Sequence, residues 1–502
     1  MLKKILILSI FFPALCTGQW VQQGEDIYGA AGGDQAGYAL SLSADGNTVA
    51  IGSRYNDSNG SASGHARVFE NQDGSWVQKG EALTGDDVSD VFGSSISLSA
   101  DGDILAVGAP DNNGDSFEVG NVKIFRFESD NWVQIGDEIL GESLSDHSGT
   151  AISLSDDGNR VAIGAPNSGS NIGHVRVYEN VDDEWVQLGD DIDGENENDY
   201  SGTSVSINED GSIVAIGAPN NGDSGIASGH VRVFQEESGV WIQIGEDIDG
   251  GQDYYKAGSS VSINNQGNIL AIGAIDNNNS GSARVYENQS NTWVQIGSDI
   301  TGEGSNDDLG FSITINAEGN IFAVGSPFND GGTLNAGQAK VYENVNNDWI
   351  QIGDDIYGVN VEDRSGTSIS LSADGSKIAT GAHLNDGNGT SSGHARIFSN
   401  SMVSGIRDTK LNASFSIYPN PGNGKFTIMP KTLNRVLSYK VIDMAGRIST
   451  SLDGRLNPKD DQGIENGVSG QEINVDLPSG VYLLRLELED GSIESYRIGV
   501  VR

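Results

Sequence analysis

Acidic side chains recur at one position of a repeated pattern, three residues before a glycine. The set consists of Asp34, Asp90, Asp146, Asp199, Asp307 and Asp363, and Tyr255 takes the place in the fifth copy. Carboxylates gathered around an axis would bind a cation or accept hydrogen bonds from sugar hydroxyls. Alternatively, each Asp caps its own turn by accepting hydrogen bonds from backbone N–H groups. Its repetition in almost every copy favours the capping interpretation, and the ligand ring is the alternative.

A second group of oxygen-bearing side chains follows the tripeptide Gly-Ala-Pro or its variants. The residues in this group are Asp57, Asp111, Asn113, Asp115, Asp223, Asp330 and Asp386. Calcium takes six to eight hard oxygen ligands, which Asp and Asn supply. Solvated turns use the same residue types. We therefore expect no required cofactor, and calcium is the candidate ion for these loops.

Basic residues occupy one strand position in all seven copies, namely Arg67, Lys123, Arg176, Arg232, Arg284, Lys340 and Arg396. His65, His174, His230 and His394 precede four of them by two positions, which places both on one face of a strand. A mid-strand position favours ion pairs or stacking between neighbouring units over reading of a ligand.

No side chain stands out from the repeats as a nucleophile or as an acid/base pair would. The only cysteine, Cys16, lies in an N-terminal leader, so thiolate chemistry, disulfides and cysteine metal sites are excluded for the rest of the chain. We therefore expect a protein that is not an enzyme. The alternative is a polysaccharide-active enzyme that uses the carboxylates around the central funnel of the fold.

The elements that would position these residues are set by seven tryptophans in one register: Trp20, Trp76, Trp132, Trp185, Trp241, Trp293 and Trp349. Their spacings of 52 to 56 residues indicate stacked copies of one unit. Each unit holds four short apolar or alternating runs separated by Gly, Asn and Asp, which predicts four antiparallel strands. Seven such units predict an all-β, seven-bladed β-propeller.

The order of the runs also predicts how the ring closes. If the strand after Phe92-Gly93 is innermost, the Trp strand is outermost. The last unit (367–398) then lacks a Trp strand, and the first Trp strand (20–23) lacks a blade. We expect residues 20–23 to complete the seventh blade, which removes exposed strand edges.

Two motifs resemble a known family. Phe92-Gly93 followed by Gly108-Ala109-Pro110 is similar to the FG-GAP repeat of integrin-α-type propellers, and Gly-Ala-Pro recurs at 164–166 and 217–219. The resemblance implies the propeller fold. Calcium-binding blades of that family carry several acidic residues in the hairpin before Gly-Ala-Pro, where this chain has only Asp101. The resemblance therefore implies that this hairpin site is absent here.

The ends of the chain differ in composition from the repeats. Residues 1–18 combine Lys3 and Lys4 with an apolar run and predict an export signal peptide. Of the 28 basic and 71 acidic residues, 14 and 59 lie in residues 19–402, a net charge of −45. The region from 403 onward is neutral overall, which predicts a domain boundary near 402. The acidic field excludes nucleic acid as a partner, and no segment is long enough to span a membrane.

After a linker at 403–414, residues 415–502 resemble the type A C-terminal sorting domain of the type IX secretion system. The resemblance rests on motifs that include Tyr418, Pro419, Asn420, Pro421, Gly446, Gly480 and Tyr482. It implies recognition by the type IX secretion machinery, removal of the domain, and release or attachment at the cell surface. Alternating runs and Gly/Pro turns independently predict a small β-sandwich.

Together these patterns predict a secreted or surface-displayed protein that binds an extracellular glycan or protein on the long-loop face of the propeller. The main alternative is a structural surface or matrix component without a discrete ligand.

Overall fold

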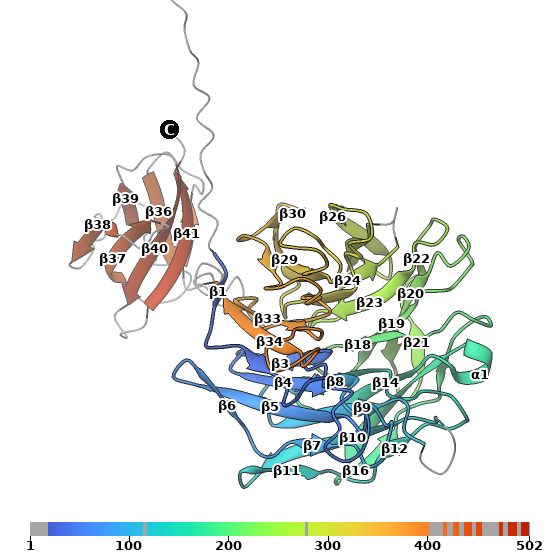
Figure 1. The fold of residues 1–502 in the computed structure, drawn as a ribbon. Helices are drawn as coiled ribbons and strands as arrows, with labels where there is room; N and C mark the ends of the chain where they lie inside the picture. Colours follow the sequence, from blue (N-terminus) through green and yellow to red (C-terminus); the bar gives the residue numbers. More distant parts are fainter. Residues whose placement is uncertain are drawn as a thin grey trace, which may run out of the picture. The chain divides into compact units, whose positions relative to one another are not determined.

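The computed structural model describes residues 19–113, 118–276 and 280–400, and in the C-terminal region only the strands β35 to β41. Gln19–Asn400 form one compact unit, and the C-terminal strands belong to a second. The predicted leader at 1–18, the linker at 403–414 and the boundary near 402 lie outside the described residues. Figure 1 shows the first unit as a ring of small sheets.

The first unit is a seven-bladed β-propeller, as the repeats predict. In a typical blade, four antiparallel strands are hydrogen-bonded in chain order, and a two-residue strand extends the edge of the third. Blade one consists of β3 (Ala39–Leu42), β4 (Thr48–Ser53), β5 (His65–Gln72), β6 (Ser75–Gln78) and β7 (Leu83–Thr84). Blade two consists of β8 (Ser95–Leu98), β9 (Ile104–Ala109), β10 (Asn121–Glu128), β11 (Asn131–Gln134) and β12 (Ile139–Leu140). Blade three consists of β13 (Ala151–Leu154), β14 (Arg160–Ala165), β15 (His174–Val181), β16 (Glu184–Gln187) and β17 (Ile192–Asp193).

The remaining blades repeat this pattern, except that in the fifth blade the Trp strand and the short strand are one continuous strand. Blade four consists of β18 (Ser204–Ile207), β19 (Ile213–Ala218), β20 (His230–Glu236), β21 (Trp241–Gln243) and β22 (Ile248–Asp249), and blade five of β23 (Ala257–Ile263), β24 (Ile269–Ala274), β25 (Ser282–Asn288) and β26 (Trp293–Thr301). Blade six consists of β27 (Ser312–Ile315), β28 (Ile321–Ser326), β29 (Gln338–Val345), β30 (Asp348–Gln351) and β31 (Ile356–Tyr357), and blade seven contains β32 (Ser368–Leu371), β33 (Lys377–Ala382) and β34 (His394–Ser399).

The first strand of each blade is the innermost, which confirms the predicted order. First strands of neighbouring blades contact one another around a closed circle in which β32 meets β3. The backbone N–H of Leu98 donates to Ser41 Oγ of the preceding blade at 3.1 Å. The same bond joins Leu154 to Ser97 at 2.9 Å. Alternate residues of the first strands, such as Ile96 and Leu98, are buried between blades, as expected for strands covered on one face.

The N-terminal strands complete the seventh blade, as the phase of the repeats predicts. β1 (Val21–Gln22) pairs with β34, with Val21 opposite Ser399. β2 (Ile27–Tyr28) pairs with the other end of β34, with Ile27 opposite Ala395. Ile27 is buried. In Figure 1 the dark-blue β1 lies beside the orange β34. The first and last segments of the propeller thus share one sheet.

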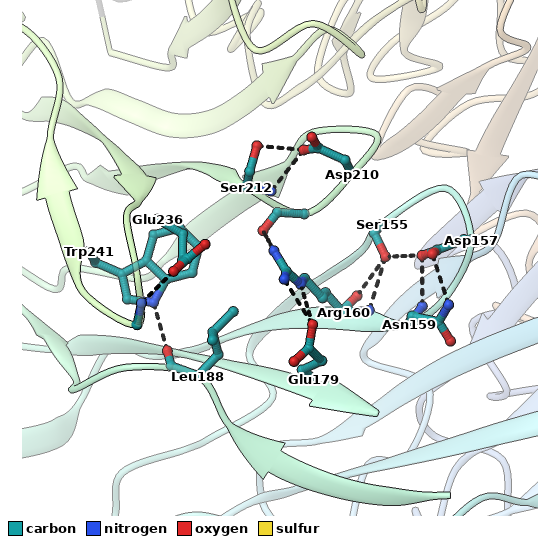
Figure 2. Close-up of polar contacts among 12 residues, drawn as sticks. Ser155, Asp157, Asn159, Arg160, Glu179, Leu188, Asp210, Ser212, Glu236 and Trp241 are labelled. Atoms are coloured by element: carbon teal, nitrogen blue, oxygen red, sulfur yellow. Dashed lines mark hydrogen bonds and ion pairs between the residues drawn. The ribbon is translucent and has the colours of Figure 1, made fainter. Parts of the chain in front are cut away.

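Every tryptophan holds two blades together at the outer edge. The indole N–H of Trp241 donates to the carbonyl of Leu188 at the end of the preceding Trp strand, at 2.8 Å (Figure 2). The other six indoles make the same bond at 2.8 to 3.1 Å. The glycine four residues after each Trp makes room for the indole of the next blade. A Cβ on Gly80, where φ is +74°, would lie 2.8 Å from Trp132 Cδ1.

Polar turns join the first two strands of each blade. Asp157 accepts hydrogen bonds from Ser155 Oγ and from the backbone and side-chain N–H groups of Asn159 (Figure 2). Arg160 pairs with Glu179 and donates to the carbonyl of Gly211 in the next blade. Among the described residues of the propeller there is one helical turn, α1 (Ser168–Asn171), which the all-β prediction does not include. Gly169 and Ser170 adopt left-handed backbone angles there, so this turn does not produce helical periodicity.

The C-terminal strands form two antiparallel sheets, in line with the predicted small β-sandwich. One sheet has the order β35 (Phe415–Tyr418), β36 (Lys425–Pro430) and β39 (Gln471–Asn474). The other has the order β38 (Ile448–Asp453), β37 (Val436–Asp443), β40 (Gly480–Leu488) and β41 (Ile493–Val500).

Candidate functional site

Two long loops per blade gather on one face of the propeller. The linker loop leads from one blade to the first strand of the next, and the hairpin loop joins the second and third strands. Backbone bonds tie the hairpin loop of one blade to the following linker loop: Tyr200 N–H donates to the carbonyl of Asn171 at 2.9 Å, and Ser201 N–H to that of Ile172 at 3.0 Å. The loops therefore form a continuous, connected surface.

The six aspartates of the predicted ring are buried within the linker loops. Asp90 accepts hydrogen bonds from the backbone N–H groups of Asp86 and Asp87 at 3.0 and 2.8 Å. Equivalent bonds are made by Asp34, Asp146, Asp199, Asp307 and Asp363, and each of the six is at most 3% exposed. Burial, opposed by these hydrogen bonds, raises the pKa of Asp90. The contacts match the turn-capping interpretation, and a ligand ring stays a prediction.

An asparagine from the hairpin loop secures four of these carboxylates, and in blade two it is Asn112 that donates to Asp90. Asn221, Asn329 and Asn385 donate through Nδ2 to Asp199, Asp307 and Asp363 at 2.8 to 3.0 Å. These asparagines are not among the predicted site residues. The signal was present, because Asn follows the Gly of Gly-Ala-Pro by four residues in most copies. The pairing locks the two long loops of one blade together.

The residues of the predicted calcium loops are spread over separate hairpin loops. Asp57, Asp330 and Asp386 each accept a hydrogen bond at 2.8 Å from the backbone N–H five residues later in their own loop. Asn113 makes the same bond with Glu118 at 3.3 Å. Asp111 lies 3.1 Å from His147, Asp223 is exposed, and Asp115 lies outside the described residues. Calcium binding by these loops stays a prediction.

The basic stripe joins neighbouring blades, as predicted. Arg67, Arg176, Arg232 and Arg396 donate to backbone carbonyls at the end of the preceding blade at 2.5 to 2.8 Å. Arg284 reaches Gly250 at 3.4 Å. The two lysines bind acids of the preceding linker loop instead, Lys123 with Asp86 and Lys340 with Glu303. These side chains are therefore occupied by contacts between blades.

Two buried histidines, His65 and His383, predict an acid-sensitive propeller. Burial and the neighbouring Arg67 lower the pKa of His65 to about 3, and burial together with Arg54 and Arg364 does the same for His383. A folded pKa below the unfolded value means that the unfolded chain binds more protons. Stability is therefore complete above about pH 6.5 and falls as the pH drops toward 3.

His65→Asn places at this position the residue type of Asn121 in the second blade. Between pH 7 and pH 4 we expect the free energy of unfolding of this variant to fall by roughly 2 to 3 kcal/mol less than that of the unaltered chain. Urea unfolding across this pH range measures the change. His147→Asn is the control, because the pKa of His147 is raised by its hydrogen bond to Asp111. An equal reduction of the acid-side loss in both variants would contradict the assignment.

Two clusters of potential metal ligands were not assembled from the sequence. They are His174, Asp191 and Asp193 in blade three, and Glu195, His230 and Asp247 at blade four; within each, one ligand atom per residue lies within 4.8 Å of the others. Their sequence signal is an acidic residue six positions after Trp, as at Asp191 and Asp247, which recurs in six of the seven units.

A hollow of about 330 Å³ opens beside these clusters at the junction of blades three and four. Its wall includes Asp191 and Asp193 from blade three and Arg232 and Trp241 from blade four. The wall combines carboxylates and one guanidinium with the aromatic rings of Phe234 and Trp241 and the aliphatic side chains of Ile192 and Val240.

Of the predicted sorting residues, Tyr418 lies at the end of β35, and Gly480 and Tyr482 lie in β40. Pro419, Asn420, Pro421 and Gly446 lie outside the described residues. Within the described part of the chain, no helix is long and apolar enough to cross a membrane.

Comparison with known proteins identifies the C-terminal region. Residues 416–498 match the family described as the secretion system C-terminal sorting domain, and no curated protein matches the chain. The chain thus carries a type IX sorting domain, which indicates export to the cell surface or the extracellular space. The propeller agrees with the fold implied by the FG-GAP resemblance, whereas membership of that family stays a prediction.

Three solved structures are among those with some similarity to this chain, each with a TM-score below 0.5. A putative 6-phosphogluconolactonase from Bacteroides uniformis is 11% identical with a TM-score of 0.47, covering 64% of this chain and 85% of that one. The structure of U3-55K is 10% identical with a TM-score of 0.47, covering 77% and 100%. The periplasmic gluconolactonase PpgL from Pseudomonas aeruginosa is 14% identical with a TM-score of 0.42, covering 64% and 88%.

Proposed function

We propose that this exported chain is a non-catalytic recognition protein that binds an extracellular protein or glycan on the long-loop face of its propeller. The observation that carries the proposal is a set of large apolar side chains exposed on the linker and hairpin loops. They are Val88, Leu144, Ile226, Tyr254, Leu334, Val359 and Val361, each 55% to 65% exposed. Apolar side chains exposed together on one acidic face are typical of an interaction surface.

Two of these side chains lie on loops that are hydrogen-bonded to each other. The N–H of Glu362, which follows Val361, donates to the carbonyl of Leu334 at 2.9 Å. Aliphatic side chains outnumber aromatic ones in the exposed set, and sugars are usually held by stacking on aromatic rings. The composition therefore favours a protein partner over a glycan.

The rigidity of the loops supports recognition by a preformed surface. Backbone bonds between blades and the Asp–Asn pairs within blades hold both long loops in place. A surface that is already ordered loses little conformational entropy on binding. The six aspartates of the predicted ring accept hydrogen bonds from the backbone of their own turns, which also supports a role that is not catalytic.

Binding of the exported protein to arrays of extracellular proteins and glycans tests the proposal. We expect saturable binding to one ligand class, weakened about tenfold or more by Leu334→Asp combined with Val361→Asp. The matched control is Val133→Asp with Val186→Asp on the outer strands, where the side chains are 48% and 49% exposed. Equal weakening by both pairs, or turnover of the ligand, would contradict the proposal. Arrays without a saturable ligand would favour the structural alternative.

A further inference from the structure

Four residue positions recur at each junction between blades. They are the first residue of the third strand, the basic residue two positions later, the residue six positions after Trp, and an early residue of the preceding linker loop. In blade four these places are taken by His230, Arg232, Asp247 and Glu195. We refer to this arrangement as the junction pocket.

In blades two and six the junction pocket is built around a cation. Lys123 pairs with Asp86 and lies 4.0 Å from Glu138. Lys340 lies 2.5 Å from Glu303 and 3.8 Å from Asp355. In both pockets one ammonium group therefore lies between two carboxylates. The amide at the start of the strand, Asn121 or Gln338, donates to one of these acids.

Blade four keeps both carboxylates but has no ammonium group in the pocket. Arg232 donates instead to the carbonyl of Asp193 at 2.5 Å. Its Nη1 is 3.7 Å from Glu195 Oε1, which leaves Oε2 of the same carboxylate facing His230. In blade four the cation beside Glu195 is therefore the guanidinium of Arg232, and no ammonium group lies between the two acids.

The imidazole of His230 lies close to both acids. Its side chain is 1% exposed, and Nδ1 is buried without a hydrogen-bond partner. Nδ1 lies 3.6 Å from Asp247 Oδ2 and 3.9 Å from Glu195 Oε2. A buried nitrogen without a partner is costly in a folded protein. A metal ion bound between these three atoms would satisfy it.

The surroundings of the pocket are strongly acidic and open to solvent. Burial raises the pKa of Glu195; Arg232 opposes this shift, and Asp247, Asp223 and Asp199 add to it. Burial and Arg232 lower the pKa of His230, and Asp247, Asp199 and Asp223 oppose this shift. The side chains of Glu195 and Asp247 are 35% and 29% exposed, so an ion can enter from solvent.

We propose that Glu195, His230 and Asp247 form a binding site for a divalent transition metal ion of the zinc class. One imidazole nitrogen and two carboxylate oxygens are ligands that zinc accepts, whereas calcium prefers oxygen alone. Three protein ligands leave at least one coordination position for water or for a group of a partner. The site is separate from the apolar loop surface, so it does not depend on the proposed function.

Calorimetric titration of the exported protein with zinc chloride tests the site. We expect His230→Asn to weaken zinc binding by about 10- to 100-fold. His65→Asn is the matched control, because its pocket has Ala82 and Ala30 at the two carboxylate positions, and it should leave zinc binding unchanged. Calcium chloride should give no corresponding heat at this site.

A second variant tests the comparison between blades directly. Arg232→Lys recreates the residue of blades two and six, and its ammonium group should lie between Glu195 and Asp247. We expect this conservative change to weaken zinc binding as strongly as His230→Asn, while circular dichroism shows an unchanged β fold. Zinc should raise the thermal unfolding temperature of the unaltered chain more than that of either variant, because the cluster of His174, Asp191 and Asp193 is unchanged in both. Equal zinc affinity in all variants would show diffuse binding to surface acids and overturn the proposal.

Discussion

Removal of residues 19–28 is expected to lower the free energy of unfolding of the propeller by roughly 5 kcal/mol. The deletion takes away β1 and β2, their ladder bonds to β34, the buried Ile27 and the indole bond of Trp20 to the carbonyl of Ile352. It also exposes the edge of β34, which promotes pairing between chains. Urea unfolding and size-exclusion chromatography would measure the two effects.

Val21→Ala is the control for this deletion, since the side chain belongs to the same segment but is 58% exposed. We expect it to change stability by less than about 0.5 kcal/mol. A deletion variant as stable and monomeric as the unaltered chain would contradict the role of the N-terminal strands in closing the ring.

Gly164→Ala is expected to cost about 3 kcal/mol or more, although it adds one methyl group. Gly164 is the glycine of a Gly-Ala-Pro motif and lies in β14. A Cβ there would lie 2.1 Å from the carbonyl oxygen of Gly202 in the next blade. The obstacle is backbone, which cannot rotate away as a side chain does. The blades would have to separate locally, and thermal or urea unfolding measures the loss.

Gly222→Ala provides the comparison for that substitution. Gly222 has an ordinary φ, and the nearest atom to an added Cβ would be 3.9 Å away. We expect no loss of stability, and a gain of about 0.4 to 1 kcal/mol from the stiffer unfolded chain. Similar losses at both positions would show that the contact between blades is not what makes glycine necessary.

The Gly164 contact recurs at every junction and explains two motifs at once. The glycine of Gly-Ala-Pro or its variants in one blade meets the glycine before the first strand of the next, as Gly52 meets Gly93 and Gly381 meets Gly37. A Cβ at these glycines would lie about 2 Å from that carbonyl. The Gly-Ala-Pro and Phe-Gly signatures therefore mark the places where neighbouring blades touch through backbone.

The fold could be predicted because its determinants are local or periodic. The tryptophan register set the blade count, the runs separated by Gly, Asn and Asp predicted the four strands of each blade, and the phase of the repeat assigned Trp20 to the last blade. Each of these rests on residue types at fixed spacing. The one helical turn, α1, was missed because a single turn with left-handed residues leaves no periodic pattern.

The site was less predictable, because its contacts depend on where side chains point. The sequence allowed Asp199 either to join a ligand-binding ring around the propeller axis or to cap its own turn. The spacing of residues alone does not distinguish these two orientations of the side chain. Its bond to Asn221 joins loops 22 residues apart. The cluster of Glu195, His230 and Asp247 draws on three segments from two blades. Histidine and acid were both visible in the sequence, but their convergence depends on the angle between blades.

Folding of the propeller has to finish with the segment that was made first. Val21 pairs with Ser399, so β1 stays without its partner until the last strand of the ring is available. Contacts between distant residues are slow to form, because the chain entropy is lost before the contact stabilises the fold. A chain of repeats with two free ends needs special terminal units. Here the two ends cap each other, and no blade is terminal once the ring is closed.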